Sequence, residues 1–225
     1  DYAPDFGVAQ PHEIALSDLH CQIIPWQQAV RWAWSQGEWP LWNPFILNGD
    51  ILAAAAQPAV YDPLQILGML LPLPDALTFG ASMTFFIAAF FTFAFARATG
   101  LKEIAALVAA AGFTFCGMMA FFVGWPLART WAWLPLVLFA VRERRWVMLT
   151  VAFVLVIFAG HPESVLHVVA IGAVYGVGLK PDLRSARSAL VAGLMALALG
   201  ARVFTQTSTV SVAAWTPFET RTWNE

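Results

Sequence analysis

Side chains able to do acid–base or metal chemistry gather in two short stretches of this sequence. His161 and Glu163 stand in the run AGHPE, and Asp18 and His20 stand in SDLHCQ near the start of the chain. A carboxylate can take a proton from a hydroxyl group, and histidine together with carboxylate suits ions such as zinc. Asp18, His161 and Glu163 are therefore the catalytic candidates. The pattern requires no cofactor, and a divalent metal is one option.

Each of these candidates also has a purely structural interpretation. Asp18 stands where an amphipathic helix is expected to begin, so its side chain is placed to cap that helix. His161, Pro162 and Glu163 form a turn between two apolar segments, and a carboxylate in the first turn of a helix is favoured by the helix dipole. The residues alone leave both interpretations open.

Composition places the chain among membrane proteins. It has 225 residues, of which 60% are hydrophobic and 12% charged, and its mean hydropathy is +0.68. One soluble core cannot cover that much apolar surface, which predicts a multi-pass membrane protein with the lipid bilayer as its partner. Twelve Lys and Arg with a net charge of −2 exclude a nucleic-acid partner, which needs a concentrated basic face. Cys21 and Cys116 are expected to be isolated thiols.

Residues 1–75 are expected to form a long extracytoplasmic loop that lies on the membrane. The stretch from Ser17 onward is too polar and too often interrupted by proline to cross a bilayer, and its many tryptophans suit the boundary between water and lipid. Apolar residues at steps of three and four predict an amphipathic interfacial helix over 18–36, capped by Ser17 or Asp18 and ended by Gly37. The later run PLQILGMLLPLP predicts a second, short interfacial helix.

Residues 76–204 are expected to form an all-α, polytopic bundle of about six transmembrane helices, and residues 205–225 an extracytoplasmic tail. The first two apolar segments reach the length of about 20 residues that a bilayer core requires. The middle three are shorter because prolines interrupt them, so tilt or kinks are expected there. The predicted segments are 76–96, 104–124, 126–141, 146–160, 163–179 and 189–204.

Basic residues predict the orientation of this bundle. Cytoplasmic loops of membrane proteins carry an excess of Lys and Arg. Three loops hold most of the basic residues, so we expect these loops in the cytoplasm. The long first loop, the turn at 160–163 and the C-terminal tail are then outside. The basic residues concerned are Arg97, Lys102, Arg142, Arg144, Arg145, Lys180, Arg184 and Arg187.

Several motifs together resemble the YfhO-type bacterial membrane proteins. The pattern D-x-x-x-Q-x-x-P-W begins at Asp18, G-E-W-P-L-W-N-P spans 37–44, and Q-P-x-x-Y-D-P-L spans 57–64. Further along, A-W-L-P-L at 132–136 and A-G-H-P-E at 159–163 fall where that family has similar motifs. Each piece is weak alone, but the combination is specific and covers most of the chain.

The resemblance implies a function as well as a fold. Proteins of this family look like GT-C-fold glycosyltransferases, which take a sugar from a polyprenyl-phosphate carrier at the outer face of the bacterial cytoplasmic membrane. In that superfamily an acidic residue early in the first outer loop acts as catalytic base or metal ligand, and Asp18 matches that position. A carboxylate would deprotonate the acceptor hydroxyl, and positive charge would stabilise the leaving phosphate.

The same resemblance gives the loop residues a role in substrate binding. Polar side chains there would contact the sugar, Trp39 and Trp42 would stack on it, and arginines at the outer ends of helices would face the phosphate. Turn hydrogen bonds explain Asn43, Gln57 and Asp62 somewhat better, and anchoring at the membrane boundary explains the tryptophans without a ligand. The candidates for substrate binding are Gln22, Trp42, Asn43, Gln57, Arg129 and Arg202.

A non-catalytic function is the alternative. The small residues from Ala109 to Gly112 permit close contact between membrane helices, as in an accessory subunit packed into a larger membrane complex. His167 stands inside an apolar segment, where a hydrogen-bonded packing role is the ordinary interpretation, although intramembrane ionisable groups also invite a functional one.

Overall fold

The computed structural model is built almost entirely of helices, so the all-α class is confirmed. Within the described residues, the regular strands are β1 (Trp42–Asn43) and β2 (Asp50–Ile51), which pair antiparallel with Trp42 opposite Ile51. The structure describes residues 17–46, 49–179, 191, 193–194 and 198.

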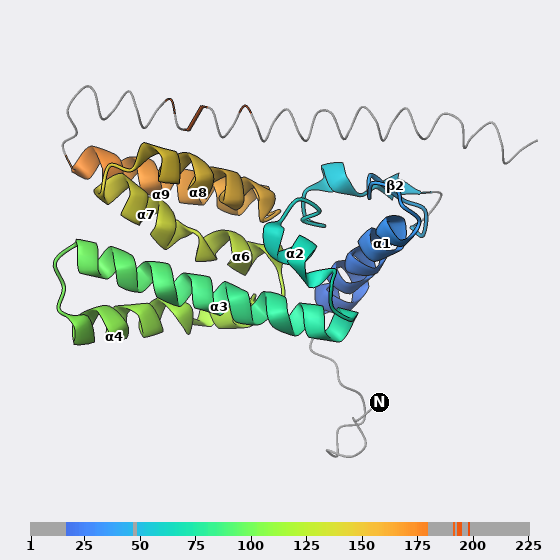
Figure 1. Ribbon diagram of the computed structural model, residues 1–225, viewed down its shortest axis with the longest axis horizontal. Helices are drawn as coiled ribbons and strands as arrows, with labels where there is room; N and C mark the ends of the chain where they lie inside the picture. The colour runs from blue at the N-terminus through green and yellow to red at the C-terminus, as the bar shows by residue number, and fades with distance from the viewer. Residues whose placement is uncertain (1–16, 47–48, 180–190, 192, 195–197, 199–225) are drawn as a thin grey trace, which may run out of the picture.

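The chain forms two parts that lie end to end (Figure 1). The first, which we call the loop layer, comprises the described residues up to 72. The second, which we call the bundle, comprises residues 73–179. The predicted apolar segment 189–204, the tail 205–225 and residues 1–16 lie mainly or wholly outside the described residues.

The loop layer is organised by an amphipathic helix, as predicted. A π-helical turn, η3 (Leu19–Ile23), leads into α1 (Ile24–Ser35), which buries Ala29, Val30 and Ala33 at steps that place them on one face. This face packs against Leu52, Ala53 and Val60, which belong to or flank the 3₁₀ turn η4 (Ala53–Ala55). The second short helix is α2 (Pro63–Gly68).

The ends of this helix differ in how well they were predicted. Gly37 has φ +74°, a conformation that glycine adopts without strain, and it follows the helix end as expected. The expectation that Asp18 caps the helix is wrong. Its backbone is already helical and its side chain makes no capping hydrogen bond, because the chain enters η3 directly rather than through an extended residue.

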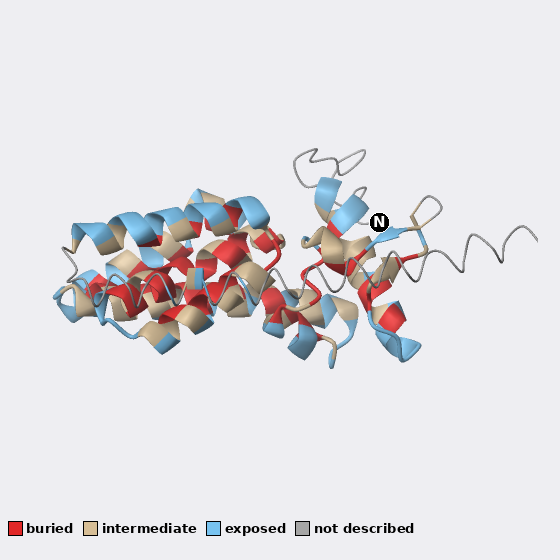
Figure 2. Cartoon of the chain, turned by 90° about the horizontal axis from the view of Figure 1, so that it is seen from above, coloured by how far each residue is buried: buried red, intermediate tan, exposed pale blue. Residues whose placement is uncertain are grey.

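The bundle is centred on α6 and α7, which run between the α3/α4 pair and the α8/α9 pair (Figure 1). Val137 and Ala140 of α7 are fully buried, and Figure 2 shows buried residues concentrated along the middle of the bundle. Its helices are α3 (Leu73–Ala98), α4 (Glu103–Thr114), α5 (Gly117–Phe121), α6 (Pro126–Ala132), α7 (Leu134–Arg142), α8 (Trp146–Phe158) and α9 (Pro162–Gly178).

Two predicted segments are interrupted. The prediction of one helix of about 20 residues over 104–124 is wrong. There α4 ends at Thr114, and the extended Cys116 begins a separate short helix, α5. The segment 126–141 is divided at Trp133, and Pro135 lies in the first turn of α7, the position where a missing N–H group costs nothing.

Length and apolar composition single out α3. Among the described helices it alone is long and apolar enough to cross a membrane, and α4, α8 and α9 are shorter apolar helices. Large apolar side chains are nevertheless exposed on the outer surfaces of all four helices. They include Phe86, Phe90, Ile104, Leu107, Val108, Val147, Val151, Leu166, Val174 and Val177.

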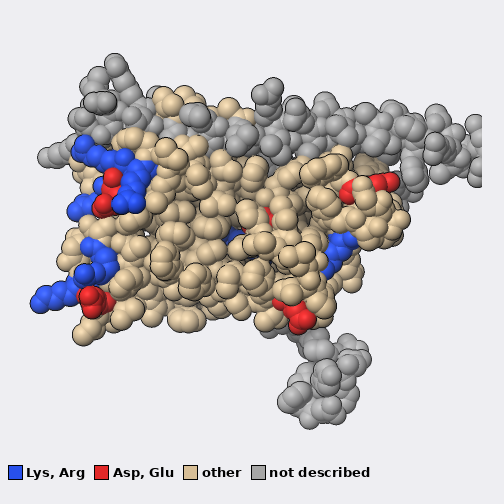
Figure 3. Space-filling model, in the orientation of Figure 1, with Lys and Arg blue, Asp and Glu red and all other residues tan. Residues whose placement is uncertain are grey.

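Charge is distributed unevenly along the bundle. The α3–α4 loop holds Lys102, and the α7–α8 loop holds Arg144 and Arg145. Both loops lie at the end of the bundle that is remote from the loop layer (Figure 1). Figure 3 shows most of the Lys and Arg side chains of this face gathered at that end. The third predicted basic loop lies outside the described residues.

Candidate functional site

A buried ion pair joins the loop layer to the bundle. Arg129 of α6 donates from Nη1 to Oδ2 of Asp62 at 2.5 Å, and the Asp62 side chain is completely buried. The other oxygen of Asp62 accepts from the backbone N–H of Leu64 and so caps α2. A methyl group at Gly80 of α3 would lie 2.7 Å from Nη2 of Arg129, so a side chain there would force the guanidinium to shift.

Hydrogen bonds also hold α1 against α2. Gln27 donates to Gln65 at 2.7 Å, and Gln65 donates to the carbonyl oxygen of Pro58 at 2.8 Å. Arg31 donates to the carbonyl oxygens of Gly68, the last residue of α2, and Leu71, three residues further on. The position of α1, and with it of η3, is therefore fixed through α2 and Asp62 to α6.

The AGHPE turn lies where the loop layer touches the bundle. Gly160 has φ +93°, and a methyl group there would come within 2.7 Å of the carbonyl oxygen of Ala56 and 2.9 Å of Ala59. Only glycine fits this contact. The helix α9 then begins at Pro162 with Glu163 in its first turn, so the predicted turn between two helices is confirmed.

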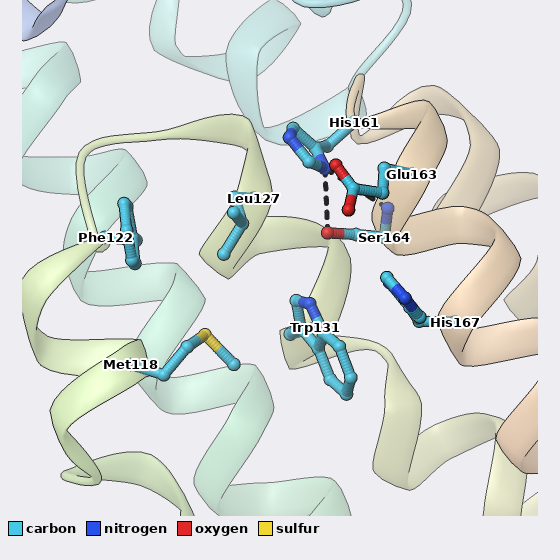
Figure 4. Close-up of a pocket in the computed structure, with 8 residues that line it drawn as sticks. All are labelled: Met118, Phe122, Leu127, Trp131, His161, Glu163, Ser164 and His167. Atoms are coloured by element: carbon cyan, nitrogen blue, oxygen red, sulfur yellow. Dashed lines mark hydrogen bonds between the residues drawn. The ribbon is translucent and has the colours of Figure 1, made fainter.

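His161 is the N-cap of α9. Its Nδ1 accepts a hydrogen bond from the backbone N–H of Ser164 at 3.2 Å and lies 2.8 Å from the Ser164 hydroxyl (Figure 4). A backbone N–H can only donate, so Nδ1 must be unprotonated and the ring proton lies on Nε2. Burial lowers the pKa of His161, opposed by the Glu163 carboxylate and assisted by His167. Both observations favour a neutral ring.

A cavity of about 360 Å³ opens beside this turn, between α5, α6 and α9 (Figure 4). Its wall is mostly apolar, and its polar groups come from the first two turns of α9. The Trp131 and His167 rings stack, with centroids 6.1 Å apart and planes inclined by 25°. The residues that line it are Met118, Phe122, Leu127, Trp131, His161, Glu163, Ser164 and His167.

Asp18 and Gln22 are exposed at η3. A methyl group at Gly124 would lie 3.0 Å from Leu19, so η3 rests against the connection between α5 and α6, just after the cavity-lining Phe122. Among the described residues, no hydrogen bond or ion pair joins Asp18 to the His161 turn. The structure thus packs η3 on the α5–α6 connection, while the His161 turn lines the cavity together with Phe122.

The predicted substrate-binding residues divide by environment. Asn43 is buried and its Oδ1 accepts from the backbone N–H of Phe45, which is the turn role. Trp42 packs over Gly49. Gln57 is exposed and directly follows Ala56, whose carbonyl oxygen lies against Gly160. Arg129 is occupied by Asp62 and is not free for a phosphate, because the buried carboxylate already neutralises it. Arg202 lies outside the described residues.

A metal site built from His20, His161 and Glu163 is not formed. In the described part of the chain, no three His, Cys, Asp or Glu side chains come together as a metal ion requires. His20 is on η3 in the loop layer, whereas His161 and Glu163 are on α9.

Of the eight residues that line the cavity, sequence reasoning predicted only His161 and Glu163 as site residues. Ser164 follows His161 by three positions, the spacing at which an N-cap receives a backbone N–H, and this signal was readable. Trp131 and His167 meet only because α6 packs on α9, which no local pattern reveals. No family model, curated protein or solved structure matches the chain, so its function must be inferred from these residues.

Proposed function

We propose that this chain is a multi-pass protein of the bacterial cytoplasmic membrane and a glycosyltransferase of the GT-C type, as its resemblance to YfhO-type proteins implies. It would transfer a sugar from a polyprenyl-phosphate donor at the outer membrane face. The observation that carries this proposal is Asp18. Its carboxylate is exposed, caps no helix, and forms no ion pair among the described residues.

The surroundings of Asp18 support a catalytic role. It precedes a π-helical turn, a feature that is rare in proteins and frequent at functional sites. Leu19 packs at Gly124, which lies in the chain between the cavity-lining residues Phe122 and Leu127. A ligand in the cavity would extend toward η3, where an unpaired carboxylate can take the proton of an acceptor hydroxyl.

The bundle supports the membrane assignment. Large apolar side chains cover the outer surfaces of α3, α4, α8 and α9, as expected for helices in contact with lipid. The basic α3–α4 and α7–α8 loops share one end, and the loop layer lies at the other. By the positive-inside rule, this arrangement supports an extracytoplasmic position for the loop layer, Asp18 and the cavity.

Substituting Asp18 tests the enzyme proposal. Asp18→Asn should lower sugar transfer about 10²- to 10⁴-fold, the contribution of a general base, without loss of folded protein. The matched control is Asp75→Asn, which changes an exposed carboxylate in the first turn of α3. Transfer is measured in proteoliposomes that contain polyprenyl-phosphate sugars. Equal activity of the two variants would refute the catalytic role.

An accessory subunit of a larger membrane complex is the second candidate, and the outer surface of α4 favours it. Ala111 and Gly112 are exposed, and no atom lies within 4 Å of the position of a methyl group at Gly112. Such a surface accepts a partner helix closely. If this function holds, Gly112→Leu should release the protein from a native complex that withstands purification, while Asp18→Asn should leave that complex intact.

A further inference from the structure

We propose that the cavity between α5, α6 and α9 binds an uncharged, hydroxylated ring such as a pyranose, with the Nε2–H group of His161 donating a hydrogen bond to it. The proposal rests on the proposed function, in which a sugar must be held near Asp18. It goes further by assigning the sugar ring, and not the phosphate, to this cavity.

Size limits the ligand first. Pockets for small molecules in proteins occupy roughly 300–1,000 Å³, and this one has about 360 Å³. It therefore suits one ring rather than a chain of several. The cavity is open to the surface and is lined by His161 and Glu163 of the AGHPE turn, so a ring inside it could remain linked to a longer molecule outside.

The wall and the rim offer different chemistry. Met118, Phe122 and Trp131 supply apolar and aromatic surface, against which the C–H face of a pyranose can pack. His161, Glu163 and Ser164 supply polar groups along one side (Figure 4). A few polar groups on an apolar wall fix the orientation of a ligand and provide its specificity.

His161 can serve only as a donor toward the ligand. Its Nδ1 is occupied by the backbone N–H of Ser164, so the ring proton is held on Nε2. Figure 4 shows this second nitrogen on the side of the ring facing away from Ser164. Glu163 is exposed beside it, and its carboxylate can only accept. A donor next to an acceptor matches the hydroxyl groups of a sugar.

The charge of the lining disfavours a phosphate. Among the described residues, the titratable groups that line the cavity are His161, Glu163 and His167, and no Lys or Arg lines it. The described lining thus offers one carboxylate, that of Glu163, and no Lys or Arg side chain to balance it. A phosphate placed there would be repelled rather than stabilised.

Photoaffinity labelling tests this assignment in the full-length protein in nanodiscs. The probes are alkyl pyranosides that carry a diazirine on the ring, in the gluco, galacto, manno and N-acetylglucosamine series. We expect saturable labelling within Met118–Trp131 or His161–His167, which the matching methyl pyranoside suppresses and inorganic phosphate does not.

Two substitutions separate binding from folding. His161→Asn keeps an oxygen that caps α9 but removes the Nε2 donor. The probe concentration that gives half-maximal labelling should therefore rise three- to tenfold. Glu163→Gln should raise the same concentration ten- to a hundredfold, because it removes a charged hydrogen-bond acceptor. Glu143→Gln, an exposed carboxylate at the opposite end of the bundle, is the control and should change nothing.

Two outcomes would overturn the proposal: no saturable labelling of these segments by any probe, or suppression by inorganic phosphate. Labelling measures binding without transfer. Its failure would remove the sugar from this cavity, while the Asp18→Asn assay would still decide whether the protein is a transferase.

Discussion

The loop layer and the bundle bury polar groups in opposite ways. In the bundle, buried threonine hydroxyls bond within their own helix: Thr84 to the carbonyl of Gly80, and Thr130 to that of Pro126. In the loop layer, buried Asp62 and Gln65 bond to partners 67 and 38 residues away in sequence. These bundle threonines bond locally, and the buried Thr114 hydroxyl has no partner among the described residues. Asp62 and Gln65 of the loop layer instead join elements that are distant in sequence.

This difference indicates how the two parts are positioned. The bundle core is apolar, centred on side chains such as Val137 and Leu149, and apolar packing is not directional. The loop layer has a small apolar cluster, and the Asp62–Arg129 pair fixes its place on the bundle. Because α1 is hydrogen-bonded to α2, and η3 leads into α1, this ion pair also influences where Asp18 lies.

The largest expected effect is at that ion pair. Arg129→Met leaves the buried Asp62 carboxylate without its partner, which typically costs about 3–5 kcal/mol in the free energy of unfolding. We expect a lower melting temperature in detergent and faster proteolysis within residues 49–72.

Adding Asp62→Asn to Arg129→Met is the control, because it removes the stranded charge and keeps a side chain that can cap α2. The double variant should recover part of the loss. A single variant as stable as the wild type would show that the pair does not hold the two parts together.

Removing an apolar side chain from the bundle core should lower the free energy of unfolding nearly as much, without loosening the loop layer. Leu149→Ala removes a fully buried side chain of α8 and should cost about 2–5 kcal/mol in the free energy of unfolding. Melting of the whole protein and proteolysis of the loop layer are measured together. Cleavage within 49–72 well before the bundle melts would contradict the difference between the two parts.

Removing a buried polar group from the bundle should cost little. Thr84→Val deletes a hydroxyl bonded to its own helix, and we expect a loss of about 1 kcal/mol or less, because the Gly80 carbonyl can still accept within the helix. A loss as large as that of Arg129→Met, measured under the same conditions, would erase the contrast between the two parts.

The smallest effect is a pH dependence from His161. Its pKa in the folded protein is lowered by burial, so the unfolded chain binds a proton more readily. The stability that the folded protein gains from a neutral His161 is fully present above the pKa of the unfolded chain, about 6.5. It is lost as the pH falls toward the lower pKa of the folded protein. Melting between pH 5 and 8 should show a decline at acid pH that is weaker in His161→Asn. An unchanged profile would remove His161 as its source.

Local patterns predicted the elements better than their meeting points. The apolar spacing of Ile23, Val30 and Ala33 marked the face that η3 and α1 bury, and the long apolar run marked α3. The break at Cys116 was not visible, because no proline stands there. Asp62 and Arg129 lie 67 residues apart, and only the packing of α6 against α2 and α3 shows that Arg129 is neutralised rather than facing a ligand.

The central claim is that the loop layer and the cavity share the extracytoplasmic side, opposite the basic loops. It is tested most directly by single cysteines placed at Gln57, His161 and Glu143, in a background with Cys21→Ser and Cys116→Ser. The sites are labelled in intact cells with a membrane-impermeant maleimide. We predict labelling at 57 and 161, and labelling at 143 only after the membrane is permeabilised. Equal labelling of 143 and 161 in intact cells would contradict the account.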